Sequence, residues 1–309
     1  MHQQPLRIAT RKSALALWQA EHVAARLRAL LPGQAVELVP LTTQGDRNLQ
    51  DSLALAGGKG LFVKELETAL AENRADLAVH SMKDVPVTLP TDFVIAAVLE
   101  REDPRDAFIS ARWPAFEALP AGAKVGSSSL RRQCQLLHQR PDLKLLPLRG
   151  NVDTRLKKLE AGEYDAVILA VAGLKRLALA HKITAVLDVR VSLPAIAQGT
   201  IGVECRAGDK ETLGLLKQLN HAPTWQRTLA ERALNRGLSG SCNLPVAGYA
   251  ELQADTLTLR GRVGLPDGSR LIDGERRGPA DHAEMLGEQL ANDMLGRGAA
   301  QVLRQVMER

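Results

Sequence analysis

The sequence predicts two α/β domains with mainly parallel sheets, followed by a small C-terminal α+β domain. Apolar strand-like segments alternate with amphipathic helical segments through the first two thirds of the chain. One of these strand-like segments, Asp165–Val171, is almost wholly apolar, which is typical of a parallel strand buried on both faces. In the last third, strand-like segments are grouped together and a long helical segment follows them.

The N-terminal part of the chain begins with a strand, a helix and a second strand. We expect strands at Leu6–Thr10, Val36–Leu41, Leu77–His80 and Val94–Leu99, and helices at about Ala14–Leu31 and Phe62–Glu72. The first helix has Ser13 as a plausible N-cap and ends at Pro32-Gly33. Residues Thr42–Gly60 show little periodicity, and we interpret them as a mobile loop.

The central part repeats the alternation after a charged, proline-containing junction at Glu100–Arg105, which suits a linker between domains. Strands are expected at Lys124–Gly126, Leu143–Leu148 and Asp165–Val171, and helices from about Leu130, at Val152–Glu160 and at Lys175–Ala180. Leu193–Glu204 contains Pro194 and Gly199, and it suggests a second crossing between domains.

The C-terminal part predicts a helix, a group of strands and a closing helix. The helix is expected at Thr224–Asn235, the strands at Val246–Leu252, Leu257–Gly264 and Arg270–Glu275, and the closing helix from about Asp281. The last two strands form a hairpin around Pro266–Ser269.

Composition narrows the class of partner. The chain has 309 residues and a net charge of +5, and 28 of its 40 basic residues are arginine, whose guanidinium forks onto carboxylates or phosphates. Aromatic residues are only 3%, too few for a base-stacking platform, so a small acidic ligand is favoured over nucleic acid.

Targeting and metal signals are missing from the sequence. The N-terminus lacks an apolar signal region and the longest apolar run is too short to span a bilayer, so we expect a cytoplasmic protein without membrane contact. The three cysteines are widely separated and odd in number, which favours a reducing compartment. No HExxH or CxxC motif predicts a metal, and no GxSxG motif predicts a serine hydrolase.

Three basic clusters occur where a strand turns into a helix. They are Arg11 with Ser13, Ser127–Arg132, and Arg149 with Arg155. Cations at a helix N-terminus oppose the helix dipole, so their repetition predicts a site for a carboxylate or phosphate. Solvated arginines on separate faces are the alternative. The hydroxyls of Ser127, Ser128 and Ser129 could cap a helix, complete an anion nest, or do both.

Two further segments contain side chains suited to ligand binding or to reaction. Lys83 and Asp84 follow the strand Leu77–His80, at the strand end where open α/β sheets bind ligands, although a surface ion pair is the simpler interpretation. Cys242 lies in the polar, glycine-containing segment LSGSCNLP and is either reactive or a small buried residue. Cys134 and Cys205 fit structural positions.

Seven long segments and one short one carry a resemblance to a known family. They are IATRKSALALWQA at 8–20, GGKGLFVKELE at 57–67, DLAVHSMKDVP at 76–86, EREDPRDAF at 100–108, GSSSLRRQCQL at 126–136, LRGNVDTRL at 148–156, YDAVILAVAGLKRL at 164–177 and GSC at 240–242. In this order they resemble the porphobilinogen deaminases (hydroxymethylbilane synthases) of tetrapyrrole and haem biosynthesis.

The resemblance implies two lobes like those of periplasmic binding proteins, with a small third domain. The implied domains are 1–99 with 197–219, 100–196, and 220–309. It also implies a monomeric, metal-free transferase that condenses four porphobilinogen molecules head to tail, with loss of ammonia, into hydroxymethylbilane. The reaction takes place on a dipyrromethane cofactor, which the resemblance attaches to Cys242 through a thioether.

The resemblance also implies roles for individual residues. Those implied to bind the cofactor are Lys83, Asp84, Ser127, Ser128, Ser129, Arg131, Arg132 and Arg155, together with Cys242. Those implied to bind substrate acids are Arg11, Ser13, Arg149 and Arg176. Asp84 would be catalytic, facing pyrrole nitrogens and stabilising positive charge as ammonia leaves.

Departures from the family pattern are mild: Ser127, Ser241 and Ala197 stand where Thr, Gly and Gly are usual, and Gln44 replaces a basic residue in the loop. The alternative function is a non-catalytic cleft protein that binds a small dicarboxylate. Binding of nucleic acid is a third, less favoured possibility.

Overall fold

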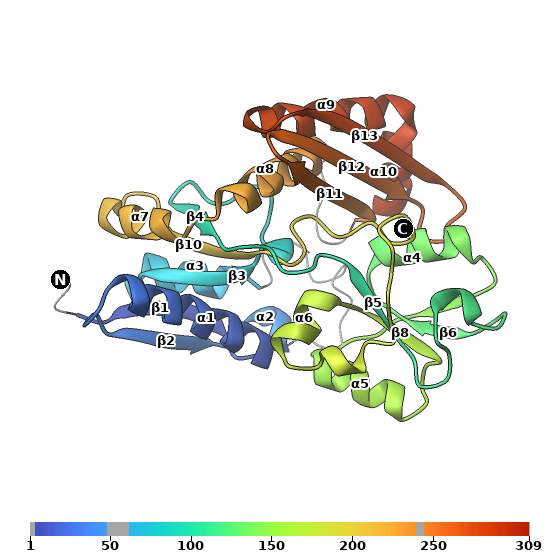
Figure 1. Ribbon diagram of the computed structural model, residues 1–309, viewed down its shortest axis with the longest axis horizontal. Helices are drawn as coiled ribbons and strands as arrows, with labels where there is room; N and C mark the ends of the chain where they lie inside the picture. The colour runs from blue at the N-terminus through green and yellow to red at the C-terminus, as the bar shows by residue number, and fades with distance from the viewer. Residues whose placement is uncertain (1–3, 48–61, 239–243, 309) are drawn as a thin grey trace. The chain divides into compact units, whose positions relative to one another are not determined.

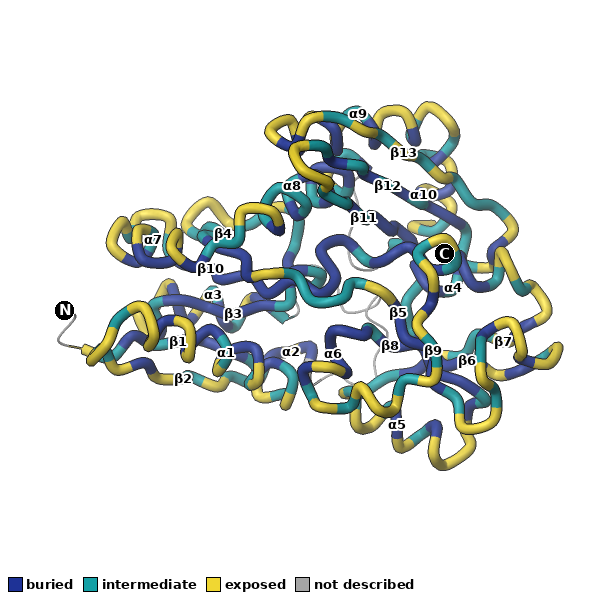
Figure 2. Tube along the Cα trace, in the orientation of Figure 1, coloured by how far each residue is buried: buried dark blue, intermediate teal, exposed yellow. Residues whose placement is uncertain are grey.

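The computed structural model describes residues 4–47, 62–238 and 244–308 (Figure 1). The chain forms two compact units, Met1–Glu102 with Thr200–Trp225, and Asp103–Gly199 with Gln226–Arg309. In each sheet the strands are largely buried, and the helices keep an exposed side (Figure 2).

The first unit is a five-stranded sheet with helices on both faces. Its strands are β1 (Leu6–Arg11), β2 (Val36–Leu41), β3 (Leu77–Ser81), β4 (Phe93–Val98) and β10 (Ile201–Arg206), in the order β2-β1-β3-β10-β4. Its helices are α1 (Ala14–Leu30), α2 (Gln44–Arg47), α3 (Lys64–Ala71) and α7 (Lys210–Leu216). β1 pairs in parallel with β2 and β3, whereas β10 is antiparallel to both neighbours. Apolar residues of α1 and α7 pack on one face of the sheet and those of α3 on the other, because successive strand residues point to opposite faces.

The second unit contains a sheet of the same design. Its strands are β5 (Asp106–Ile109), β6 (Lys124–Gly126), β7 (Lys144–Leu146), β8 (Ala166–Ala170) and β9 (Ala185–Val186), in the order β7-β6-β8-β5-β9. β6 is parallel to β7 and β8, and β5 is antiparallel to β8 and β9. Helix α4 (Leu130–Gln139) packs on one face, and α5 (Val152–Glu160) and α6 (Val171–Arg176) pack on the other. In both sheets four strands run one way and one opposes them, which confirms the prediction of mainly parallel α/β sheets.

The C-terminal part is a small α+β arrangement, also as predicted. Its antiparallel strands β11 (Val246–Gln253), β12 (Thr256–Gly264) and β13 (Leu271–Pro279) lie in that order. Apolar residues of α8 (Ala222–Gly237), α9 (Ala283–Met294) and α10 (Ala300–Met307) share a core with the sheet. A π-helical turn, Leu295–Ala299, joins α9 to α10, and its Gly298 has a φ of 104°. Short 3₁₀ turns occur at Met82–Asp84, Phe116–Ala118, Ala180–Lys182, Lys217–Leu219 and Ala280–His282.

Several elements differ from the expectation. β5, β9, β10 and α7 were not predicted. The expected helix Lys175–Ala180 has the wrong bounds, because α6 (Val171–Arg176) starts directly after β8 and only its last two residues fall in the expected range. Gln44–Arg47 is helical within the expected loop Thr42–Gly60, and residues 48–60 of that loop lie outside the described part of the chain. None of the described helices is long and apolar enough to cross a bilayer.

Candidate active site

A 3₁₀ turn after β3 presents Lys83 and Asp84. Met82, the first residue of this turn, is buried and donates its backbone N–H to the Thr200 oxygen at 3.0 Å. Gly202 on β10 makes this possible, because a Cβ there would lie 2.1 Å from the Met82 sulfur. With Met82 anchored in this way, Lys83 and Asp84 remain half-buried at the carboxyl end of the strand. Among the described residues, none forms a hydrogen bond or ion pair with the Asp84 carboxylate.

Arg11 and Ser13 lie at the same edge of the same sheet, because β1 and β3 are parallel neighbours. Arg11 ends β1, and its guanidinium lies 4.2 Å from the centroid of the Phe62 ring. Ser13 caps α1 by accepting the Ala16 N–H at 3.4 Å. The sheet topology therefore brings together the four predicted site residues of the first unit.

A buried pair that sequence reasoning missed joins β3 to β10 just before the turn. His80 Nε2 lies 2.7 Å from Glu204 Oε2, and both residues are buried. Nearby Glu67 on α3 has a raised pKa, chiefly because of burial and also because of the Glu204 charge. This pair braces the two strands that hold the Asp84 turn.

In the second unit, three serines connect β6 to α4, and their hydroxyls have different partners. The Ser128 hydroxyl bonds to the segment that follows β7: it donates to the Leu148 oxygen at 3.0 Å and accepts the Leu148 N–H at 2.9 Å. The Ser127 hydroxyl accepts the Ser129 N–H at 3.3 Å. Ser129 occupies the N-cap position, but its side chain does not cap the helix. Ser129 is therefore the serine best suited to receive a ligand.

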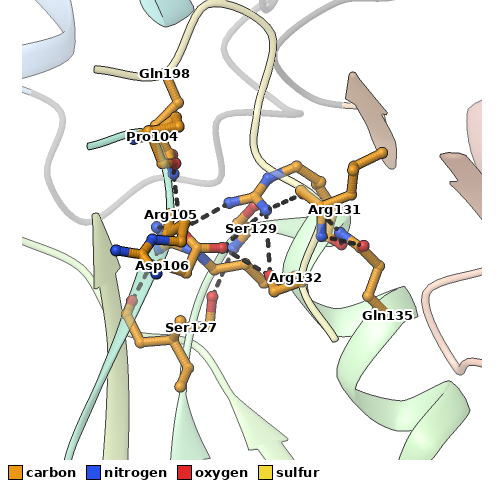
Figure 3. A network of polar contacts seen from close by, with 12 residues as sticks. Pro104, Arg105, Asp106, Ser127, Ser129, Arg131, Arg132, Gln135 and Gln198 are labelled. Carbon is orange, nitrogen blue, oxygen red and sulfur yellow. Dashed lines mark hydrogen bonds and ion pairs between the residues drawn. The ribbon is translucent and has the colours of Figure 1, made fainter. Parts of the chain in front are cut away.

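Arg131 and Arg132, in the first turn of α4, converge on one buried carboxylate (Figure 3). The Asp106 Oδ1 atom accepts from Arg132 at 2.7 Å, Gln198 at 2.9 Å and Arg131 at 3.3 Å. The Oδ2 atom accepts from Ser192 at 2.7 Å and Arg131 at 2.9 Å. Burial alone would raise the pKa of Asp106, but the charges and hydrogen bonds of the two arginines hold it well below its usual range.

The charge of this cluster is unbalanced. Two buried guanidiniums face one carboxylate, and the buried Nε of Arg132 has no hydrogen-bond partner in the described chain. A buried surplus cation with an orphaned donor favours a further anion at this position. Sequence reasoning missed Asp106 and Gln198; an acidic residue at the head of an otherwise apolar segment, DAFI, was the available signal.

Arg149, Arg155 and Arg176 follow β7 and β8, the parallel neighbours of β6, so they lie at the same sheet edge as the serines. Gly150 has a φ of 108° and turns the chain into α5, which Asn151 caps through the Thr154 N–H at 2.9 Å. The Arg155 Nε donates to the Gly150 oxygen at 2.8 Å, and Arg176 donates to the Gly199 oxygen at 2.6 Å. Arg149 and Arg155 remain half-buried, and Arg176 is buried.

The described cysteines are structural, as predicted. Burial raises the pKa of Cys134 to about 12 and that of Cys205 to about 11, so both thiols stay protonated near neutral pH. Cys242 lies outside the described residues. Within the described chain, no group of His, Cys, Asp or Glu side chains is suited to hold a metal.

Comparison with known proteins identifies the family. The sequence model described as "Porphobilinogen deaminase, dipyromethane cofactor binding domain" matches residues 6–214, and that described as "Porphobilinogen deaminase, C-terminal domain" matches residues 225–296. The chain belongs to the porphobilinogen deaminase family. It is a transferase of tetrapyrrole biosynthesis that condenses four porphobilinogen molecules into hydroxymethylbilane on a dipyrromethane cofactor. Membership of this family disfavours the alternative of a non-catalytic dicarboxylate-binding protein.

Among solved structures, the chain is similar to several binding proteins. A putative methionine-binding lipoprotein of Bacillus subtilis is 15% identical, with 72% of this chain and 92% of that chain covered and a TM-score of 0.45. The periplasmic aliphatic sulphonate binding protein of Escherichia coli is 17% identical, with 76% and 70% covered and a TM-score of 0.42. Immunogenic lipoprotein A of Vibrio vulnificus is 14% identical, with 69% and 94% covered and a TM-score of 0.44. Because these TM-scores are below 0.5, the fold class rests on the sheets of the chain and on the family.

The residues present suit the porphobilinogen deaminase cofactor. Dipyrromethane carries acidic side chains, and the edge of the second sheet offers the Ser129 hydroxyl, the orphaned Arg132 Nε and three further arginines. Guanidinium and hydroxyl donors in this number match a polycarboxylate and require no metal.

Proposed function

We propose that three sets of residues in this chain have separate roles in the deaminase reaction. One set binds the cofactor, a second binds the acids of the substrate, and Asp84 stabilises the positive charge that develops. The observation that carries the proposal is that each α/β sheet places basic predicted site residues at its carboxyl edge. At the edge of the first sheet, the Asp84 carboxylate has no hydrogen-bond or ion-pair partner among the described residues. The proposed domains are those implied by the resemblance, 1–99 with 197–219, 100–196, and 220–309.

Cofactor binding is assigned to the edge of the second sheet and to the turn after β3. Cys242 holds the dipyrromethane by a thioether, and Lys83, Arg131, Arg132, Arg155 and Ser127–Ser129 receive its acids. The Ser129 hydroxyl and the Arg132 Nε are the best supported of these donors, because within the described chain the hydroxyl does not cap α4 and the Nε has no hydrogen-bond partner. Ser127 and Ser128 contribute chiefly by shaping the turn, since their hydroxyls bond to backbone groups.

Asp84 is the catalytic residue in this proposal. When bound, the cofactor supplies the pyrrole on which the chain of product grows. Loss of ammonia from porphobilinogen leaves an electron-poor methylene-pyrrole, and the fixed Asp84 carboxylate stabilises the positive charge as it develops. The same carboxylate oxygens accept hydrogen bonds from pyrrole N–H groups and transfer protons during each condensation. Lys83 beside it engages acids, so the two neighbours have separate tasks.

Arg11, Ser13, Arg149 and Arg176 bind the acids of the incoming or growing pyrrole chain. We further propose that the enzyme is a monomer and that it is located in the cytoplasm. The free thiols of Cys134 and Cys205 are compatible with a reducing compartment.

Replacing Arg149 with leucine tests the substrate assignment. We expect Arg149→Leu to fold normally but to stall chain growth, with product formation reduced about tenfold or more, because one charge-assisted contact to each incoming acid is lost. Intact-mass spectra after addition of porphobilinogen should show partly extended chains accumulating on the enzyme. Arg190→Leu is the matched control, since the Arg190 side chain is 88% exposed and pairs only with exposed Asp188 among the described residues. Full product formation by Arg149→Leu would contradict the assignment.

A further inference from the structure

Arg262, on the central strand of the C-terminal sheet, joins that sheet to helix α4. Its guanidinium forms an ion pair with Asp273 on β13. It also donates to the Gln135 side-chain oxygen at 2.8 Å and to the Arg190 backbone oxygen at 3.1 Å. Only 14% of the Arg262 side chain is exposed, so it is largely enclosed by these contacts.

Gln135 connects this contact to the cluster at the start of α4. The residue is fully buried, and its side-chain oxygen also accepts the Leu193 N–H at 2.7 Å. Its side-chain nitrogen donates to the Arg131 oxygen at 2.9 Å and to the Leu193 oxygen at 3.1 Å. The Leu193 oxygen in turn accepts from the Arg131 guanidinium at 2.8 Å, which places Gln135 next to the Asp106 cluster (Figure 3). A side-chain amide with four such contacts has all its donor and acceptor positions filled and holds one orientation.

A second contact fixes the other end of α4 against the same sheet. His138 Nδ1 is hydrogen-bonded to the Gly268 oxygen at 2.9 Å, in the β12–β13 hairpin. A Cβ on Gly268 would lie 2.4 Å from the backbone nitrogen of His138, so the hairpin approaches the helix backbone directly. The sheet therefore contacts α4 both at its middle and at its C-terminal end.

We infer that Arg262 is a positioning residue. It holds the C-terminal sheet, whose strand β11 follows Cys242, at a fixed position against α4, the helix that receives the cofactor acids. The inference rests on the proposed function. β11 starts at Val246, four residues after Cys242, and its Ala247 pairs directly with Arg262 on β12. A cofactor bonded to one element and ion-paired to another is held productively only if the two elements keep a fixed separation.

Arg260 provides a matched control on the same strand. Strand alternation places it on the same face as Arg262, two residues earlier. Its side chain is 37% exposed, and its ion-pair partners, Glu251 and Glu275, belong to the sheet itself. Replacing Arg260 therefore removes a similar charge from the same sheet without touching Gln135.

The experiment compares Arg262→Gln, Arg262→Lys and Arg260→Gln as holoenzymes, each assayed at 25 °C with porphobilinogen. Rates are expressed per cofactor-bearing chain, counted by intact mass, and thermal scans verify that each variant is folded. We expect kcat of Arg262→Gln to fall about tenfold, because small misplacements of reacting groups are costly. KM should change less than about twofold because Arg262 is not among the proposed substrate residues. Arg262→Lys should recover part of the loss, and Arg260→Gln should stay within about twofold of wild type.

Equal rates for Arg262→Gln and Arg260→Gln, whether normal or reduced, would overturn the positioning role. An unchanged kcat in a less stable Arg262→Gln would also overturn it, because only a structural role would remain. If the wild-type chain itself had the mass of the bare polypeptide, the proposed function would fail first, and the two failures are distinguishable.

Discussion

Replacing Asp84 with asparagine should remove most turnover while leaving the fold and the attached cofactor in place. Asparagine matches aspartate in shape but can neither neutralise the charge that develops as ammonia leaves nor take up a proton. General acid–base catalysis alone contributes about 10²–10⁴-fold, so we expect ammonia release by Asp84→Asn to be slower by at least about 100-fold. The measurement is the rate of ammonia release under saturating porphobilinogen.

Two controls separate this effect from damage to the site. The thermal midpoint of Asp84→Asn should equal that of wild type, because the carboxylate has no hydrogen-bond partner among the described residues. Its intact mass should still include the cofactor. A near-normal rate in a folded, cofactor-bearing Asp84→Asn would remove this residue from the mechanism.

Among the substitutions proposed for this chain, Asp106→Asn should lower the free energy of unfolding the most. The substitution leaves the buried guanidiniums of Arg131 and Arg132 without their shared counter-ion. Breaking a buried ion pair from one side typically costs about 3–5 kcal/mol, and we expect a loss of this size in the free energy of unfolding. Urea unfolding of both proteins at pH 7 measures it. Asp188→Asn is the control, because its ion pair with Arg190 is exposed and should contribute little.

The pH dependence of the free energy of unfolding provides a second measurement on Asp106. Its pKa is lowered in the folded protein, so its stabilisation is fully present above the unfolded value of about 3.9 and is lost as the pH falls below it. The difference between wild type and Asp106→Asn should therefore be constant from pH 7 to about pH 5 and shrink below about pH 4. A difference independent of pH down to pH 3 would contradict the assignment of the effect to the Asp106 charge.

Most strands and helices of the fold were predictable because their own sequences have the required periodicity. β5 was missed because it is only four residues long and begins with Asp106, inside a segment interpreted as a charged linker. β10 was missed because Gly202 and Glu204 interrupt its apolar run. Glu204 is nevertheless buried, since it pairs with His80 more than 100 residues earlier in the chain. Neither the antiparallel direction of these strands nor their position between two neighbours in the sheets leaves a local signal.

The candidate site was predictable as a set of positions, but not in its internal pairing. The location of arginines at strand-to-helix turns indicated an anion site, and the sheet order then places them at common edges. However, the sequence predicts Arg131 and Arg132 either as ligand-binding groups or as solvated surface arginines, and neither interpretation includes a buried carboxylate partner. Their buried partner, Asp106, begins strand β5, 25 residues before Arg131 and 26 before Arg132, and only the fold brings it to the first turn of α4. The serine cluster likewise resolves into two hydroxyls bonded to the backbone and one suited to a ligand.

The covalent attachment of the cofactor is the most direct test of the whole account. Intact-mass measurement of the purified wild-type chain should give the mass of the sequence plus two linked pyrrole units. The same measurement on Cys242→Ser should give the bare polypeptide, and Cys134→Ser should retain the added mass because Cys134 is a buried structural thiol. A wild-type mass equal to that of the polypeptide, or an added mass that persists in Cys242→Ser, would contradict the proposed cofactor site.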